Sequence, residues 1–127
     1  MAKTLCKITG IVLLLVGIVG FILPSILGLH LTFIHNIIHL ATAVVAIYFG
    51  FAASPRAASA FCQVFGVVYL LVALLGFVAP TVVVSLLMGH NMTEAPSIIM
   101  DNIVHLLLGV VFMVVGLVRE PQQTATT

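Results

Sequence analysis

Two long segments without a charged residue constrain the fold of this chain more than any other feature. From Ile8 to Pro55 and from Ala57 to Thr93 there is no Asp, Glu, Lys or Arg. A helix needs about 20 mainly apolar residues to cross the hydrocarbon core of a bilayer, so the first segment is long enough for two crossings. We predict four membrane-spanning helices, at Ile8–Leu27, Phe33–Ala53, Phe61–Leu87 and Ile98–Val118. The third exceeds one span and is expected to tilt, or to bend at Pro80.

Composition excludes several classes of protein. Hydrophobic residues make up 63% of the chain and charged residues only 6%, whereas a soluble domain has about 25% charged residues. A soluble enzyme, a disordered chain and a nucleic-acid-binding protein are therefore ruled out, and the expected partner is the lipid bilayer. The sequence contains no nucleophile elbow, glycine-rich phosphate loop or H-E-x-x-H motif, so we expect no catalysis.

The basic residues predict an orientation. Lys3 and Lys7 precede the first predicted helix, Arg56 lies in the second connection, and Arg119 follows the last helix. By the positive-inside rule that side is cytoplasmic, so both termini are expected inside a plasma membrane. The N-terminal apolar run resembles a secretory signal, but it lacks an A-x-A-like site and has a second copy later in the chain, so we interpret it as a retained helix. Residues 121–127 are predicted to be a disordered tail after a single domain at 1–120.

An internal repeat relates the two halves of the chain. The segment Cys6–Pro24 aligns without gaps to Cys62–Pro80, and Asn36–Gly50 aligns to Asn102–Gly116. Identical pairs include Cys6/Cys62, Gly10/Gly66, Gly20/Gly76, Pro24/Pro80, Asn36/Asn102 and His39/His105. Each copy holds two helices, so both copies enter the membrane in the same orientation. The predicted fold is an all-α integral membrane four-helix bundle made of two tandem two-helix repeats, at 6–55 and 62–121.

Small and polar residues share one face of the second and fourth predicted helices. Helical spacing gives two matching stripes: His39, Ala43, Ala46 and Gly50, and His105, Gly109, Phe112 and Gly116. Small residues mark helix–helix interfaces in membranes, so both stripes are expected to face the bundle interior. One turn further out lie His35 and Asp101, which gives an i,i+4 pair on each helix. We therefore expect a polar cluster near the outer end of the bundle.

Three interpretations of this cluster remain open. Its polar side chains are interhelical hydrogen-bonding groups, divalent metal ligands, or in part axial ligands of a b-type haem. The residues concerned are Asn36, Asn102, His39 and His105 for hydrogen bonding; His35, His39, Asp101 and His105 for zinc or copper; and His39 and His105 for haem. Asp101 also fits a simpler role, because a carboxylate in the first turn of a helix is favoured by the helix dipole.

Four other side chains are predicted from their positions. Cys6 and Cys62 fall at cytoplasmic helix ends, where a reducing compartment argues against a structural disulfide. Their thiols are expected to approach one another across the pseudo-two-fold axis, as apolar packing groups or as a redox or soft-metal pair. His30 and His90 lie in the outer connections and are expected to face solvent.

Two motifs resemble a known family. The segment Gly17-Ile-Val-Gly-Phe-Ile-Leu-Pro24, followed by His35-Asn-Ile-Ile-His-Leu40, is similar to small four-helix bacterial membrane proteins classed as a domain of unknown function, with G-x-x-G-F and H-N-x-x-H-L motifs. The resemblance implies a multi-pass plasma-membrane protein of prokaryotic type and supplies no activity. Three functions are weighed: binding of a divalent metal at the outer face, a structural or assembly subunit of a homo-oligomer or larger membrane complex, and transport of a small solute.

Overall fold

The structure is a computed structural model that describes residues 1–88 and 98–118 of the chain. Within these ranges it is helical apart from one short β-hairpin. The elements in chain order are α1 (Ala2–Gly20), β1 (Ser25–Ile26), β2 (Leu29–His30), α2 (Phe33–Phe51), α3 (Pro55–Val78), α4 (Pro80–Val83), the π-helical turn η1 (Val84–Met88) and α5 (Ile99–Leu117).

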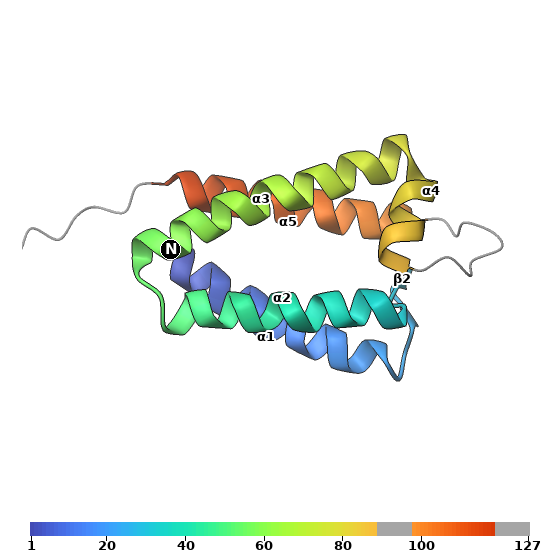
Figure 1. The fold of residues 1–127 in the computed structure, drawn as a ribbon, viewed down its shortest axis with the longest axis horizontal. Coiled ribbons are helices and arrows are strands. Elements are labelled where there is room, and N and C mark those ends of the chain that lie inside the picture. Colours follow the sequence, from blue (N-terminus) through green and yellow to red (C-terminus); the bar gives the residue numbers. More distant parts are fainter. Residues whose placement is uncertain (89–97, 119–127) are drawn as a thin grey trace, which may run out of the picture.

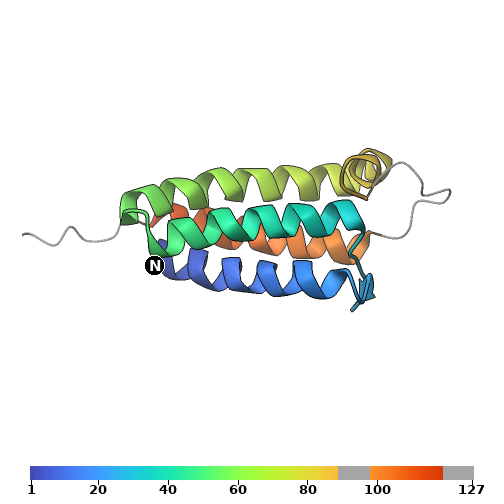
Figure 2. The same ribbon diagram turned by 60° about the horizontal axis from the view of Figure 1, so that its bottom comes forward.

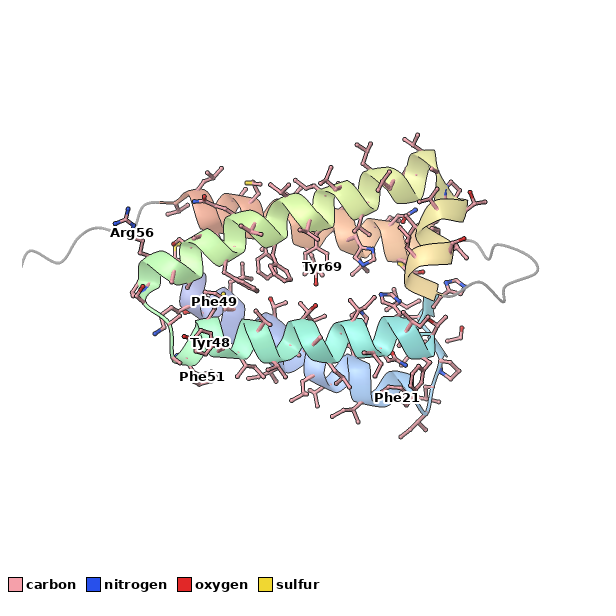
Figure 3. The ribbon with its side chains drawn as sticks, in the orientation of Figure 1. Phe21, Tyr48, Phe49, Phe51, Arg56 and Tyr69 are labelled. Carbon is pink, nitrogen blue, oxygen red and sulfur yellow. The ribbon has the colours of Figure 1, made fainter. Side chains whose placement is uncertain are left out.

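The four long helices run up and down beside one another (Figure 1). The start of α1 and the α2–α3 connection lie at one end of the bundle, and the hairpin and α4 lie at the other end. Figure 3 shows the same separation in its labelled side chains, with Arg56 at the first end and Phe21 at the second. Lys3 reaches the carbonyl oxygen of Phe51 with its Nζ, at 3.4 Å, so the described basic residues share the first end.

The helix boundaries differ from the predicted ones. Helix α1 begins at Ala2 and ends at Gly20, earlier at both ends than Ile8–Leu27, because the hairpin takes up the residues that follow. Helix α3 begins at Pro55, where proline suits the first helical position and the Ser54 hydroxyl accepts a hydrogen bond from the N–H of Ala57. It ends at Val78, before Pro80, and the chain then bends into α4 and η1. The predicted break at Pro80 is confirmed.

The hairpin depends on a tight two-residue turn. Ile26 pairs with Leu29, and the two residues between them have positive φ values, 53° at Leu27 and 78° at Gly28. This is the backbone geometry that connects twisted antiparallel strands, and glycine adopts it readily. The turn returns the chain to the bundle, so β2 lies against α5 and positions the residues that follow it.

The long helices pack as two pairs, α1 with α2 and α3 with α5 (Figure 1). In the turned view of Figure 2, α2 passes in front of α5, between α3 and α1. Glycines allow the close approach within each pair. A Cβ at Gly10 would lie 2.9 Å from the backbone N of Ile47 on α2, and one at Gly66 would lie 2.8 Å from the backbone N of Met113 on α5. Membrane helices commonly use small residues in this way, because lipid offers no hydrophobic force that drives helices together.

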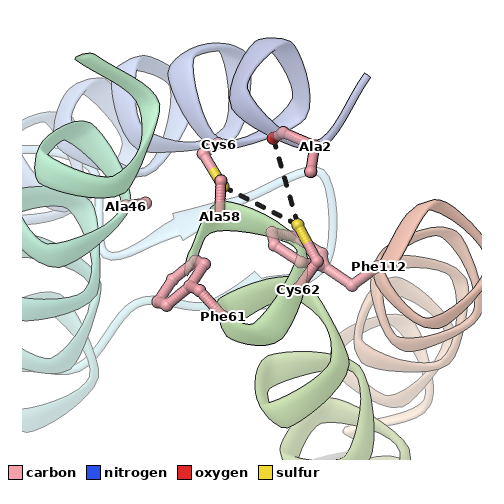
Figure 4. Packing of buried hydrophobic residues seen from close by; sticks show 7 residues of the cluster. All are labelled: Ala2, Cys6, Ala46, Ala58, Phe61, Cys62 and Phe112. Atoms are coloured by element: carbon pink, nitrogen blue, oxygen red, sulfur yellow. Dashed lines mark hydrogen bonds between the residues drawn. The ribbon is translucent and has the colours of Figure 1, made fainter. Parts of the chain in front are cut away.

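The two pairs meet at the basic end through a small apolar core (Figure 4). This core comprises Ala2, Cys6, Ala46, Ala58, Phe61, Cys62 and Phe112. The Sγ atoms of Cys6 and Cys62 lie 3.7 Å apart, both cysteines are fully buried, and both are free thiols. The predicted approach of these two thiols is confirmed. They join α1 to α3, and therefore one helix pair to the other.

The outer surfaces of all four long helices are apolar. Exposed large side chains include Ile8, Leu15, Val44, Val64, Leu74, Leu107 and Val114. Each of the four helices is long and apolar enough to cross a membrane. An exposed surface of this composition is suited to lipid rather than to water.

Candidate functional site

A cavity of about 170 Å³ lies between the two helix pairs near the hairpin end. We call it the histidine cavity. Its polar lining comes from three long helices: His35 and His39 on α2, Tyr69 on α3, and Asp101 and His105 on α5. Its apolar lining is Val12, Leu13, Val16, Leu29, Leu31, Val104 and Leu108. Figure 3 shows Tyr69 on the side of α3 that faces the α1–α2 pair.

The predicted stripes explain why these histidines face inward. On α2, Ala43 and Ala46 are fully buried, and on α5 the buried residues include His105, Gly109 and Phe112. Helical periodicity then carries His35, His39 and Asp101 to the same side as the packed small residues. The structure thus brings together all four residues that were considered as metal ligands around one cavity.

His30 closes the outer end of the cavity through hydrogen bonds on two sides. The Asp101 carboxylate accepts one bond from the backbone N–H of His30, at 3.1 Å, and lies 2.9 Å from its Nδ1. The ring of His35 donates from Nδ1 to the carbonyl oxygen of His30, at 2.8 Å. Residue 30 is therefore held by α2 and α5 together.

This arrangement explains a difference between the two aligned segments. His35 and Asp101 occupy matching positions, each directly before an asparagine. His35 faces the carbonyl oxygen of His30 and therefore donates a hydrogen bond. Asp101 faces the N–H of the same residue and therefore accepts one. The expectation that His30 faces solvent is wrong: its side chain is 24% exposed, because Asp101 draws it against α5.

Three imidazole rings and a phenol ring form a continuous cluster in the cavity wall. The ring centre of His35 lies 4.3 Å from that of His39 and 6.0 Å from that of His105. Tyr69 stacks on His105, with ring centres 5.7 Å apart and an interplanar angle of 24°. Aromatic rings at such separations pack favourably and fix one another's orientation.

Two nitrogen atoms in this cluster are buried without a partner. The Nδ1 atoms of His39 and His105 form no hydrogen bond with any group in the part of the chain that the structure describes. His105 is only 8% exposed. Leaving a buried polar group unpaired costs about 1–3 kcal/mol, and such groups in native proteins call for an explanation. Both atoms belong to rings that line the histidine cavity.

The two asparagines lie beside the cavity and serve the packing of each pair. Asn36 donates from Nδ2 to the carbonyl oxygen of Leu31, at 3.1 Å, and both asparagines are almost completely buried. Their side chains fill the space that a Cβ would need at Gly20 and at Gly76, respectively. The Oδ1 atoms of Asn36 and Asn102 have no partner among the described residues.

The described residues around the histidine cavity do not form a metal-binding group. Among the described residues, no group of three or more His, Cys, Asp or Glu side chains is arranged to hold a metal ion. The physical reason lies in Asp101, whose two oxygens are both directed at His30 instead of at an open coordination position. The first-turn position predicted for Asp101 is confirmed.

Sequence reasoning missed two members of the site. Tyr69 aligns with Leu13 in the other repeat, so a repeat-based comparison gave it no polar counterpart. Its position seven residues after Cys62, on the same face of a helix, was the available signal. His30 gave no helical periodicity to follow. His90, Arg119 and the tail at 121–127 lie outside the described residues.

Four apolar helices of spanning length, packed around a buried histidine cluster, indicate the class of multi-pass integral membrane proteins. The chain matches the family described as Domain of unknown function (DUF4383) over residues 3–118, and it belongs to that family. No curated protein and no solved structure matches the chain.

Proposed function

We propose that this membrane protein is a non-catalytic binding protein for a small molecule, held in the histidine cavity. The observation that carries the proposal is the pair of unpartnered Nδ1 atoms of His39 and His105, on two different helix pairs, in the wall of one cavity. Each Nδ1 atom exposes almost no surface, so a ligand in the cavity would reach it only after the imidazole ring turns about its Cβ–Cγ bond. The new hydrogen bond would then remove a desolvation cost that the folded chain otherwise bears.

The size and chemistry of the cavity define the kind of ligand. A cavity of about 150 Å³ lined by apolar side chains holds a benzene molecule, and this one has about 170 Å³. Its walls are apolar except for the imidazole and carboxyl groups toward the hairpin end and the phenol group of Tyr69, which lies nearer the middle of the bundle (Figure 3). We infer a ligand with an apolar body of roughly ring size and one polar end that can donate or accept a hydrogen bond.

The other interpretations receive less support. Zinc or copper would require ligand geometry that the described residues do not provide. A haem between His39 and His105 would compete for space with the ring of His35, which lies within 4.3 Å and 6.0 Å of the two ring centres. The hydrogen-bonding interpretation suits the asparagines, since Asn36 bonds Leu31 and both pack against glycines. It leaves the two histidine nitrogens unexplained.

The proposal includes the architecture around the cavity. We propose that the chain arose by tandem duplication, an origin supported by the matching glycine–asparagine contacts of Gly20 with Asn36 and Gly76 with Asn102. The orientation with both termini cytoplasmic, in the plasma membrane of a prokaryote, is supported by the clustering of Lys3, Lys7 and Arg56 at one end. Fusions of a periplasmic reporter enzyme to the C-terminus would test it, with no reporter activity expected.

Ligand-dependent stabilisation tests the binding proposal. A ligand at concentration c that binds only the folded state stabilises it by RT ln(1 + c/Kd), so above Kd the midpoint of thermal unfolding rises with the logarithm of the ligand concentration. We expect phenol to raise this midpoint in the detergent-purified protein at lower concentration than toluene, which has the same ring but no hydroxyl. His105→Phe keeps a ring at that position and removes both nitrogens, so the preference for phenol over toluene should weaken, with His39 as the remaining partner.

Tyr48→Phe is the matched control, because Tyr48 is exposed at the other end of the bundle (Figure 3). This variant should retain the full preference for phenol. Equal effects of phenol and toluene on the unaltered protein, or an unchanged preference in His105→Phe, would contradict the proposal.

A further inference from the structure

We propose that the ligand of the histidine cavity is a membrane lipid with a quinone or quinol ring, which enters sideways from the bilayer between α1 and α5. This inference rests on the proposed function, since it names the class of molecule that the cavity binds. It concerns binding alone and assigns no reaction to the protein.

The position of Val12 supports sideways entry. Val12 of α1 lines the cavity and is 50% exposed. Val16 on the same helix and Leu108 on α5 also line the cavity and are only half buried. The cavity is therefore partly open, and the residues at its opening are aliphatic. A molecule dissolved in the hydrocarbon core reaches this opening without crossing a polar surface.

Among the described residues, three that line the hairpin end of the cavity are buried. Leu31 is 1% exposed, and His35 and Asp101 are each 3% exposed, whereas Leu29 of β2 is half buried. The hydrogen bonds of His30 to Asp101 and His35 hold β2 at this end. A ligand that enters beside β2 would meet these polar groups, whereas the route past Val12 meets only aliphatic side chains and therefore favours a lipid.

The chemistry of the cluster favours a quinone ring over other lipid structures. A neutral imidazole carries one donor and one acceptor nitrogen and can exchange the two roles. The rings of His39 and His105 line the cavity. Once a ring turns so that a nitrogen faces the cavity, that nitrogen can donate to a carbonyl oxygen of a quinone or accept from a hydroxyl group of a quinol. The stacked rings of Tyr69 and His105 offer a flat surface for a planar ring. The cavity volume accommodates one ring, with the tail extending through the opening into lipid.

Tyrosine fluorescence offers a site-specific test, because the chain has two tyrosines and no tryptophan. Tyr69 lines the cavity, and Tyr48 is 59% exposed near the opposite end. In Tyr48→Phe the only emitter is Tyr69, and in Tyr69→Phe it is Tyr48. We would titrate both variants, reconstituted in lipid nanodiscs, with decylubiquinone. We expect saturable quenching of Tyr69 and only weak, non-saturating quenching of Tyr48.

A second pair of variants tests the route of entry. Val12→Phe narrows the proposed opening, whereas Val68→Phe makes the same change at the aligned position of α3, where Val68 is 46% exposed and does not line the cavity. In a background with Tyr69 as the only emitter, Val12→Phe should slow the onset of quenching by at least about tenfold. Val68→Phe should leave it unchanged.

The outcomes separate this inference from the proposed function. Equal, non-saturating quenching of Tyr48 and Tyr69 would overturn the quinone proposal. If phenol stabilises the protein selectively while decylubiquinone fails to quench Tyr69 saturably, the cavity binds a small molecule but not this lipid class. If neither probe binds, both proposals are wrong. Saturable quenching that Val12→Phe and Val68→Phe slow equally would overturn entry between α1 and α5.

Discussion

His30 connects the two helix pairs through hydrogen bonds to His35 and Asp101. The type of side chain at each position determines which group donates and which accepts. Asp101 can only accept in its ionised form, and it lies opposite the N–H and Nδ1 of His30. His35 donates to the carbonyl of the same residue. An exchange of these two side chains would place a carboxylate against the carbonyl oxygen of His30, acceptor against acceptor. On the other side, an imidazole with a single acceptor nitrogen would replace a carboxylate with two acceptor oxygens. The histidine-to-aspartate difference between the aligned segments thus has a local physical cause.

We predict that Asp101 and His30 are energetically coupled. Asp101→Ala removes both acceptor oxygens of the carboxylate, so both hydrogen bonds from His30 are lost. His30→Ala removes the ring. A double-mutant cycle of unfolding free energies in mixed micelles should give a coupling of about 0.5–3 kcal/mol. Additive effects of the two substitutions would show that the side-chain contact contributes nothing.

At the scale of elements, the close pairing of helices depends on glycines opposite bulky or polar partners. The backbone of α3 at Gly76 lies against the side chain of Asn102, and α1 at Gly20 lies against Asn36 in the same way. At Gly17 the two nearest atoms instead belong to the flexible Leu40 side chain, at 2.9 Å and 3.0 Å, and the backbone oxygen of Asn36 follows at 3.2 Å. The aligned position of the other repeat is occupied by Ala73.

Gly76→Ala should therefore destabilise the protein more than Gly17→Ala. The new methyl group at residue 76 overlaps a buried amide that has little space to move, and overpacking of this kind costs about 1–3 kcal/mol. At residue 17 the leucine can rotate away. Unfolding free energies of the two variants, measured side by side in the same micelles, check the order. A larger loss for Gly17→Ala would contradict the described packing.

At the scale of the whole molecule, the pairs meet at both ends and leave the histidine cavity between them. The apolar core around Cys6 and Cys62 joins α1 to α3 at the basic end. The hairpin and η1 make contacts with the opposite pair at the other end. An aromatic series on α3, from Phe61 through Phe65 to Tyr69, fills the interface between these ends.

Oxidation of the two thiols tests this arrangement. Iodine dissolves in lipid and can oxidise two thiols to a disulfide. The iodine molecule takes up two electrons and becomes two iodide ions, and the two thiols release two protons. Because the Sγ atoms lie 3.7 Å apart, we expect an intramolecular Cys6–Cys62 disulfide. After denaturation, the oxidised protein should no longer react with maleimide, whereas Cys6→Ser should still react at Cys62. Two reactive thiols after oxidation, or disulfide-linked dimers, would contradict the packing of α1 on α3.

Much of this fold was accessible from the sequence. The uncharged segments predict four apolar helices, and the spacing of small residues predicts which faces of α2 and α5 are buried. The helix ends are less predictable from the sequence. The charges of Lys3 and Lys7 predict a helix that begins after them, whereas α1 begins at Ala2. Charge patterning indicates which residues lie in the apolar part of the bilayer. It does not indicate at which residue a helix begins or ends.

The candidate site was predictable in its residues and not in its contacts. Periodicity placed His35, His39 and His105 on inner faces, and the structure has all three lining one cavity. The hydrogen-bond partner of Asp101 is not among the residues predicted for the cluster. It is His30, which reaches the carboxylate only because a turn with two positive φ angles redirects the chain. A contact between residues so distant in the chain depends on tertiary geometry, which local patterns do not encode.

The measurement that tests the central claim most directly is nuclear magnetic resonance of ¹⁵N-labelled histidine side chains, with phenol as the added molecule. Assignments would come from single-histidine replacements. The Nδ1 resonances of His39 and His105 should shift saturably on addition of phenol, because these atoms lack partners in the cavity wall. The Nδ1 resonance of His30, already bonded to Asp101, should remain in place. Unchanged resonances of His39 and His105 at saturating phenol, or equal shifts of all histidines, would contradict a ligand site between the helix pairs.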